Sequence, residues 1–218
     1  RTIKTSWRRG MLSVIIVGID DWERYTRPLI ADIWTHEPDA NIVVVDNASA
    51  TPYPKGEHIH RTDKRLGYAE ALNWGIDRAG DSDWYVVMNN DVRVHKAFTK
   101  RVESLATSTL YGFKKWTGHE LLKSKPDYLS SWCMLISREV WHKIGKFDEA
   151  FTPMYFEDID YCIRAAKEGI PLIEFDRDEW GIEHLYMDKE QARADFKEKK
   201  TELLNSLMNY LKEKHGIE

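Results

Sequence analysis

The sequence predicts an α/β protein with a mostly parallel, Rossmann-like central sheet and helices on both of its faces. Two observations lead to this prediction. Continuous β-branched and apolar runs, typical of strands buried on both faces, recur through the first half of the chain. Segments with apolar residues at helical spacing alternate with these runs, and this alternation is typical of parallel sheets.

The elements of the first half follow in order. "LSVIIVGI" (12–19) predicts a buried strand, and "TRPLIADIWTHE" (26–37) a helix that Thr26 can cap and whose first turn suits Pro28. A helix over 67–80 is expected to end at Gly80. The remaining elements are strands over 41–49, 57–62 and 83–91 and a helix over 95–107.

The second half is less regular. We expect a loop with at most a short strand (108–127), a strand running into a helix (127–145), a loop and then a helix from near Glu157 (147–170), and a strand (171–176). A long helix is predicted over 188–215. Its apolar stripe is Ala192, Phe196, Leu203, Leu204, Leu207, Met208 and Leu211.

We expect a single domain over 11–218. The basic residues 1–10 are interpreted as an expression leader or a short arm. The stripe of the last helix is most simply explained by packing against the rest of the domain. A dimer interface and a contact with a membrane surface stay open as alternatives.

Composition excludes several classes of function. The chain is 42% apolar and 31% charged, as in ordinary soluble domains, and its net charge of -4 gives no general attraction to nucleic acid. No stretch reaches the roughly 18 apolar residues of a transmembrane helix. Cys133 and Cys162 have neither the number nor the spacing of a disulfide framework or zinc site. We therefore expect buried free thiols and a cytoplasmic protein, with peripheral membrane contact left open.

Polar residues follow three of the predicted parallel strands. They are Asp20-Asp21, Asp46-Asn47 and Asn89-Asn90-Asp91. Asn and Asp are common turn formers, so one such end would mean little. Three on the same rim indicate a polar ligand-binding cleft, because ligands bind at the carboxyl ends of parallel strands. Asp20 and Asp21 are either a cap for the first helix, which we favour slightly, or part of that cleft.

The chain lacks the glycine-rich loops that usually hold phosphate. Neither G-x-G-x-x-G nor G-x-x-x-x-G-K-[ST] occurs. A bound phosphate would therefore need another positive charge, and a divalent cation on Asp91 would supply it. Mg²⁺ and Mn²⁺ prefer oxygen ligands and commonly use only one or two carboxylates.

Several segments taken together resemble the family 2 inverting glycosyltransferases of the GT-A fold. They are "SVIIVGI", "IVVVDNAS", "RLGYAEALNWGI", "WYVVMNNDV" and "SSWCMLISREVWHKIGKFDEAFTPMYFEDIDYCIRAAKEG", followed by a histidine. The resemblance covers about residues 11–184. It implies a nucleotide-sugar half (about 11–95), an acceptor half (about 108–187) and a C-terminal helix (188–215). It also implies transfer of a sugar from a nucleotide diphosphate, most of all UDP, to a hydroxyl of a glycan, lipid-linked saccharide or protein glycan.

The resemblance assigns the donor site to the first half. Asp46 matches the Asp that contacts the nucleoside, and Arg65 falls where residues near the base and diphosphate occur. "NND" occupies the D-x-D position, so Asp91 is the expected ligand of Mn²⁺ or Mg²⁺. Asn89 departs from the pattern and leaves one anionic ligand fewer, although it or Asn90 could contact the donor.

The resemblance assigns the chemistry and the acceptor site to the second half. In "FEDIDYC", Asp158 matches the catalytic base and Glu157 precedes it. A helix N-terminus there favours the ionised base. His184 matches a further metal ligand of many GT-A enzymes, and Trp132 could stack on an acceptor sugar or belong to the core. Asp160 points about 200° from Asp158 on a helix and is expected to be structural or to support the site through other residues.

Simpler readings and rival functions remain. "NND" could be only a strand-ending turn, and Glu157 and Asp158 only a helix cap. A non-catalytic domain that binds a nucleotide sugar or glycan is kept open by Asn89. A sugar-nucleotide pyrophosphorylase is less favoured, since "VGIDDWERY" offers no glycine-rich basic loop.

Overall fold

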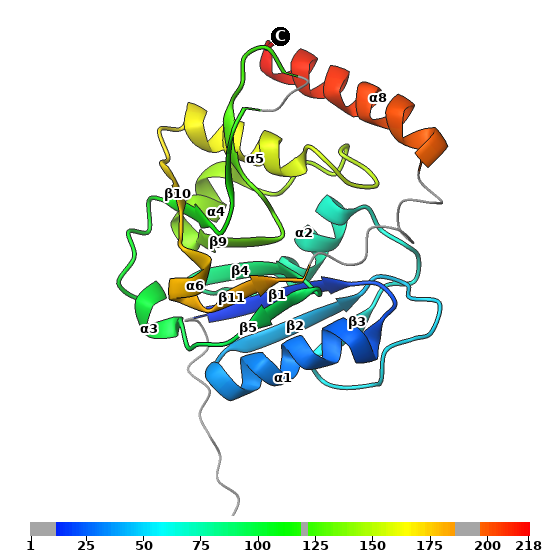
Figure 1. Cartoon of the computed structure of the whole chain (residues 1–218), viewed down its shortest axis with the longest axis vertical. Helices are drawn as coiled ribbons and strands as arrows, with labels where there is room; N and C mark the ends of the chain where they lie inside the picture. Colours follow the sequence, from blue (N-terminus) through cyan, green and yellow to red (C-terminus); the bar gives the residue numbers. More distant parts are fainter. Residues whose placement is uncertain (1–11, 119–121, 186–196) are drawn as a thin grey trace, which may run out of the picture.

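A seven-stranded sheet with helices on both faces forms the centre of the molecule (Figure 1). The computed structural model describes residues 12–118, 122–185 and 197–218. The strand order is β10-β6-β9-β4-β1-β2-β3, and all neighbours pair in parallel except around β9, which runs antiparallel to β4 and β6. The mostly parallel sheet is confirmed. Its strands are β1 (Leu12–Gly18), β2 (Asn41–Asp46), β3 (Ile59–Arg61), β4 (Trp84–Asn89), β6 (Leu110–Gly112), β9 (Cys133–Ser137) and β10 (Leu172–Glu174).

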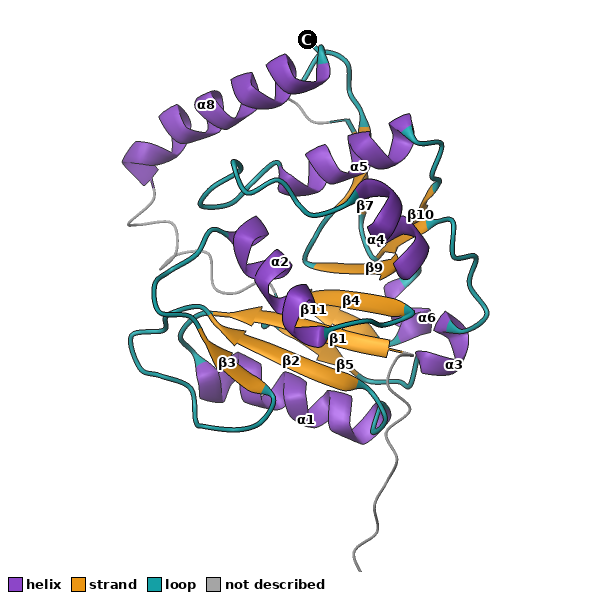
Figure 2. Ribbon diagram, turned by 180° about the vertical axis from the view of Figure 1, so that it is seen from behind, coloured by secondary structure: helices purple, strands orange, loops and turns teal. Residues whose placement is uncertain are grey.

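Alternate side chains of the strands build two apolar cores. Val14 and Ile16 of β1 face the layer that contains α1, whereas Ile15 and Val17 face the layer that contains α2. This two-sided burial explains why the strands read as continuous apolar runs. One layer holds α1 (Arg27–His36), α3 (Thr99–Val102) and α6 (Arg177–Trp180), and the other holds α2 (Tyr68–Ala79), α4 (Arg138–Ile144) and α5 (Glu157–Lys167) (Figure 2).

The start of the first helix differs from the prediction. A π-helical turn, η1 (Trp22–Thr26), leads into α1, and Pro28 lies in the first turn as expected. Thr26 makes no capping hydrogen bond, so its predicted role as a cap is wrong. Its hydroxyl bonds to other side chains at the sheet edge instead. Gly80 ends α2 with a positive φ of 69°, as predicted.

The helix predicted over 95–107 shrinks to α3. Residues just before it form β5 (Val92–Val94), which pairs antiparallel with β11 (Ile182–His184), and the N–H of His95 continues this pairing to Gly181. The buried carboxylate of Glu37 accepts hydrogen bonds from the N–H groups of Phe98 and Thr99 and so fixes the helix start at Thr99. Pairing with a distant segment therefore overrides the local helical pattern.

Two short strands, β7 (Lys115–Thr117) and β8 (Asp127–Leu129), form an antiparallel ribbon beside α5. The predicted strand at the start of 127–145 is thus divided into β8 and β9 by a turn at residues 130–132. Both cysteines are buried free thiols, as expected. Within the described part of the chain, every helix is too short or too polar to span a bilayer.

The C-terminal helix α8 (Lys197–His215) lies across α5 and the loop before it (Figure 1). The predicted stretch 188–196, with Ala192 and Phe196, lies outside the described residues. The other members of the stripe pack on α5 and its loop, which confirms the packing interpretation. These members are Leu203, Leu204, Leu207, Met208 and Leu211, and they contact a cluster that contains Phe151, Phe156, Ile159 and Ile163.

Buried charge fixes α8 to α5. The Asp160 carboxylate is fully buried and lies 2.8 Å from the Arg164 guanidinium, 2.5 Å from the Lys214 ammonium and 2.8 Å from the His215 ring. Asp160 is therefore structural, as predicted.

Candidate functional site

The three polar strand ends share one rim of the sheet. Gly18 of β1 is in register with Asp46 of β2, and Val17 is in register with Asn89 of β4. The residues that follow these strands are consequently neighbours, as the sequence predicted.

Asp46 organises the loop that follows β2. Its buried carboxylate accepts hydrogen bonds from Ser49 N (2.9 Å), Tyr53 N (3.1 Å) and Arg61 Nη1 (2.7 Å). Burial acts to raise the pKa of Asp46, but these hydrogen bonds hold the pKa below its usual value. The sequence did not single out Arg61. Only its position at the end of a short strand, 15 residues from Asp46, could have indicated this pairing.

A chain of hydroxyl and amide groups joins the other two strand ends. The Asn90 amide donates to the Thr26 hydroxyl (3.0 Å), Thr26 donates to the Tyr53 hydroxyl (3.0 Å), and Tyr53 donates to the carbonyl of Asp20 (2.8 Å). A side chain at Gly18 would come within 2.7 Å of the Tyr53 hydroxyl, so this close approach needs glycine.

Neither Asp20 nor Asp21 acts as the expected helix cap. The Asp20 carboxylate accepts from Ala50 N (2.7 Å), and Asp21 makes no side-chain capping bond. Both adopt left-handed backbone conformations, which Asp tolerates better than most residues. The rim loops therefore use Asp20 to join the β1 and β2 ends.

Asp91 and His184 meet at the same rim. β11 runs beside β5 and brings His184 Nε2 to 3.3 Å from Asp91 Oδ2, while Leu185 N donates to the Asp91 carbonyl (2.8 Å). The His184 ring stacks on Trp132, with centroids 4.4 Å apart and an interplanar angle of 7°. Trp132 is 8% exposed and thus orients His184 from the core.

The side-chain atoms Asp91 Oδ2 and His184 Nε2 are spaced so that both could be ligands of one divalent cation. Two adjacent ligands of an octahedral ion, each about 2.1 Å from it, are about 3.0 Å apart, close to the 3.3 Å separation seen here. Among the described residues no group of three or more His, Cys, Asp or Glu side chains is arranged around one point. A cation here would take its other ligands from phosphate and water.

Tyr68 joins the rim residue Asn89 to Ser131, which in turn contacts Glu157, and the sequence did not single it out. Its hydroxyl donates to Asn89 Oδ1 (2.7 Å) and lies 3.2 Å from the carbonyl of Ser131. Burial, and then the charges of Glu157, Asp158 and Asp91, raise its pKa well above the usual value. Its location in the quoted segment "RLGYAEALN" was the available signal.

Glu157 and Asp158 begin α5 as predicted. Glu157 is buried and accepts from the Ser131 hydroxyl (3.0 Å), whereas Asp158 is half-buried and accepts from Ile159 N (2.9 Å). Burial raises the pKa of both carboxyls, and the charge of Asp158 raises that of Glu157 further. The helix N-terminus favours the ionised form of Asp158, whereas burial acts in the opposite direction and raises the pKa of its carboxyl. Tyr155 and Phe156, just before, have positive φ angles of 83° and 69°.

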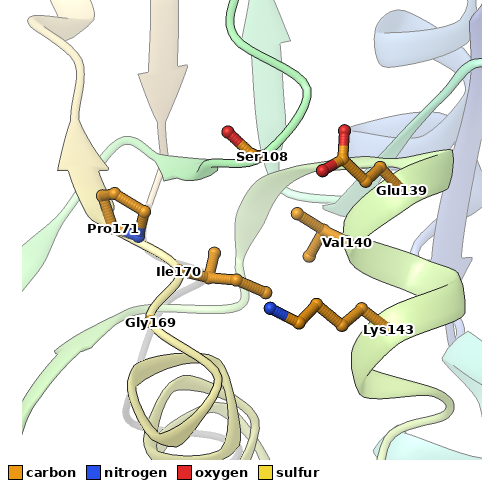
Figure 3. A pocket seen from close by; sticks show the side chains of 7 residues that line it. All are labelled: Ser108, Glu139, Val140, Lys143, Gly169, Ile170 and Pro171. Atoms are coloured by element: carbon orange, nitrogen blue, oxygen red, sulfur yellow. The ribbon is translucent and has the colours of Figure 1, made fainter.

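Other surface features lie apart from this rim. Arg65 is exposed in the loop between β3 and α2, so contact with a donor remains a prediction. A groove of about 230 Å³ opens near the amino ends of the parallel strands, away from the rim formed by their carboxyl ends (Figure 3). Its charged groups already bond to protein: Glu139 accepts from Thr107 and Lys143 donates to Glu168. The groove is lined by Ser108, Glu139, Val140, Lys143, Gly169, Ile170 and Pro171.

Proteins of similar sequence or structure include a hexosyltransferase and a mannosyltransferase. No protein-family model matches the chain. The low-salt glycan biosynthesis hexosyltransferase Agl10 of Haloferax volcanii is 27% identical over 169 residues, which cover 60% of this chain and 55% of Agl10. The chain thus spans about half the length of this relative.

Two solved structures share the fold. The mannosyltransferase PcManGT of Pyrobaculum calidifontis, in complex with GDP-Man and Mn²⁺, matches with a TM-score of 0.59 and 18% identity over 77% of this chain and 55% of its own. GalNAc-T7 with UDP, GalNAc and Mn²⁺ matches with a TM-score of 0.61 and 13% identity over 76% of this chain and 42% of its own. The chain has the GT-A fold of nucleotide-sugar glycosyltransferases.

Proposed function

We propose that this protein is a metal-dependent inverting hexosyltransferase that takes a sugar from a nucleotide diphosphate, most of all UDP, and transfers it to a hydroxyl of a glycan or glycoconjugate. One observation carries the proposal: His184 Nε2 lies 3.3 Å from Asp91 Oδ2, a pair that would hold a cation, and the charges of Asp91 and of the half-buried Asp158 both act on Tyr68. Agl10 is named a hexosyltransferase, and the two solved structures contain Mn²⁺ with GDP-Man or UDP.

Asp158 and the pair Asp91 and His184 would serve different parts of the reaction. Asp158 would accept the proton of the acceptor hydroxyl as its oxygen bonds to the anomeric carbon of the donor sugar, while the bond from that carbon to the diphosphate oxygen breaks. A single displacement of this kind inverts the configuration. A cation on Asp91 and His184 would offset the charge of the departing diphosphate.

The other rim residues would hold the donor and the base. Asp46 has two oxygens and three protein donors, which leaves acceptor capacity for a nucleoside hydroxyl. Asn89 uses its carbonyl for Tyr68 and so can offer its N–H₂ group to the donor. Glu157, bonded to Ser131, would orient the segment that carries Asp158.

The test is a thermal-shift panel of nucleotide sugars with and without Mn²⁺, followed by a donor hydrolysis assay. We expect stabilisation by one donor only with metal, and slow Mn²⁺-dependent release of nucleoside diphosphate. Asp91→Ala should abolish both effects. Asp39→Ala is the matched control, because Asp39 is exposed in the loop before β2 at the opposite end of the sheet.

Two other outcomes would contradict the proposal. Tight, metal-dependent donor binding without any turnover would instead indicate a non-catalytic nucleotide-sugar-binding domain. A flat response to every nucleotide sugar would reject a donor site altogether.

A further inference from the structure

Trp116 presents an exposed indole on the ribbon formed by β7 and β8. Its side chain lies on β7 and is 46% exposed, which makes it a large apolar surface facing solvent. The indole Nε1 donates a hydrogen bond to the Ser130 hydroxyl at 2.9 Å. This bond fixes the ring orientation, so a ligand that stacks on the ring would lose little side-chain entropy on binding.

A cation lies over the Trp116 ring. The Lys114 ammonium is 4.7 Å from the ring centroid, so it adds N–H donors on one face of the indole and leaves the opposite face for stacking. A pyranose ring has complementary chemistry, since it offers an apolar C–H face for the indole and hydroxyl groups for hydrogen bonds.

Two consecutive serines after the ribbon link Trp116 to the segment of Glu157 and Asp158. Trp116 is opposite Tyr128 in the strand register, so both side chains lie on the same face of the ribbon. Tyr128 lies on β8, which packs against the helix α5 that begins with Glu157 and Asp158. Burial and the charge of Asp158 accordingly raise the pKa of Tyr128 to about 12. Of the next residues, Ser130 holds Trp116 and Ser131 holds Glu157.

We propose that Trp116, with Lys114 over one face of its ring, forms an acceptor subsite that binds a hexopyranose ring of the acceptor near Asp158. This inference rests on the proposed function and specifies its acceptor as a saccharide recognised through its sugar ring. Trp132, the residue that the resemblance assigns to the acceptor, is 8% exposed and covers His184 with one face, so little of its ring is available.

The test measures sugar binding without any donor. Saturation-transfer NMR would use methyl α- and β-hexopyranosides of glucose, galactose and mannose with the wild-type protein, Trp116→Ala and Trp116→Phe. The control is Trp34→Ala, which removes an indole that is 53% exposed on α1. Thermal unfolding of each variant establishes that it is folded.

We expect the wild type and Trp34→Ala to saturate at least one hexoside. Trp116→Ala should lower that signal about tenfold, and Trp116→Phe should keep part of it because a ring remains. A signal that survives in Trp116→Ala, or its absence in the wild type for every hexoside, would overturn the subsite. Because no donor is present, either result is independent of the donor assay that decides the proposed function.

Discussion

Replacing Tyr68 by Phe removes the single hydroxyl group that joins Asn89 at the rim to Ser131, the neighbour of Glu157. The phenol donates to Asn89 Oδ1 at 2.7 Å, and both residues are half-buried. Leaving a buried acceptor without its donor costs about 1–3 kcal/mol. Because 1 kcal/mol shifts Tm by about 2–4 °C in a protein of this size, Tm should fall by about 2–12 °C.

The effect of Tyr68→Phe on activity should exceed its effect on stability. Asn89 would lose the contact that orients its amide, and misplacement of a site by about 1 Å can cost about 100-fold in rate. We expect kcat for donor hydrolysis to fall about 10- to 100-fold. The assays are thermal unfolding and steady-state hydrolysis in the presence of Mn²⁺.

Tyr85→Phe is the matched control for this prediction. The Tyr85 phenol also bonds to backbone, at Gly80 O (3.0 Å) and Ser82 N (3.3 Å), but it lies at the other end of β4. The Tyr85→Phe protein should lose about as much stability as the Tyr68→Phe protein and keep the wild-type kcat. A Tyr68→Phe protein with kcat within about twofold of wild type, or an equal loss in Tyr85→Phe, would refute the positioning role.

Two further predictions concern stability. Burial and the charge of Asp158 raise the pKa of Glu157, so the folded protein keeps this proton to higher pH than the unfolded chain and loses stability as pH rises above the usual value of 4.5. Glu157→Gln should therefore raise Tm relative to wild type more at pH 8 than at pH 5, and parallel pH profiles in thermal unfolding would contradict this. Asp160→Asn should lower the free energy of unfolding, measured in urea, by about 3 kcal/mol. This value is near the low end for a broken buried ion pair, because the side chains of Arg164 and Lys214 can still reach water. Asp77→Asn, which breaks the exposed ion pair with Lys146, should lower the free energy of unfolding by less than about 1 kcal/mol. Equal losses in the two variants would contradict the difference expected between a buried and an exposed ion pair.

The sequence determined the parts of the fold that depend on local pattern. β1, β2 and β4 are apolar on both faces and bounded by polar residues, so their presence and the location of their carboxyl ends could be read directly. The same holds for α2 and for the start of α5 at Glu157, where periodicity and terminal residues agree. The rim that contains Asp46 and Asp91 follows from these elements.

Only the tertiary structure decided which side chains meet across that rim. His184 reaches Asp91 because β11 pairs with β5, about 90 residues away along the chain, and no local pattern marks so short a strand. The same kind of distant contact gives Tyr68 its place beside Asn89.

Burial was likewise decided by packing. Trp116 and Trp132 are chemically the same, yet one is exposed on a ribbon and the other is covered by His184. The direction of the pKa shift at Asp158 also depended on burial, which outweighed the helix terminus that the sequence reveals. Side-chain periodicity fixes which face of an element is apolar, whereas exposure and charge depend on which distant segments come to cover that face.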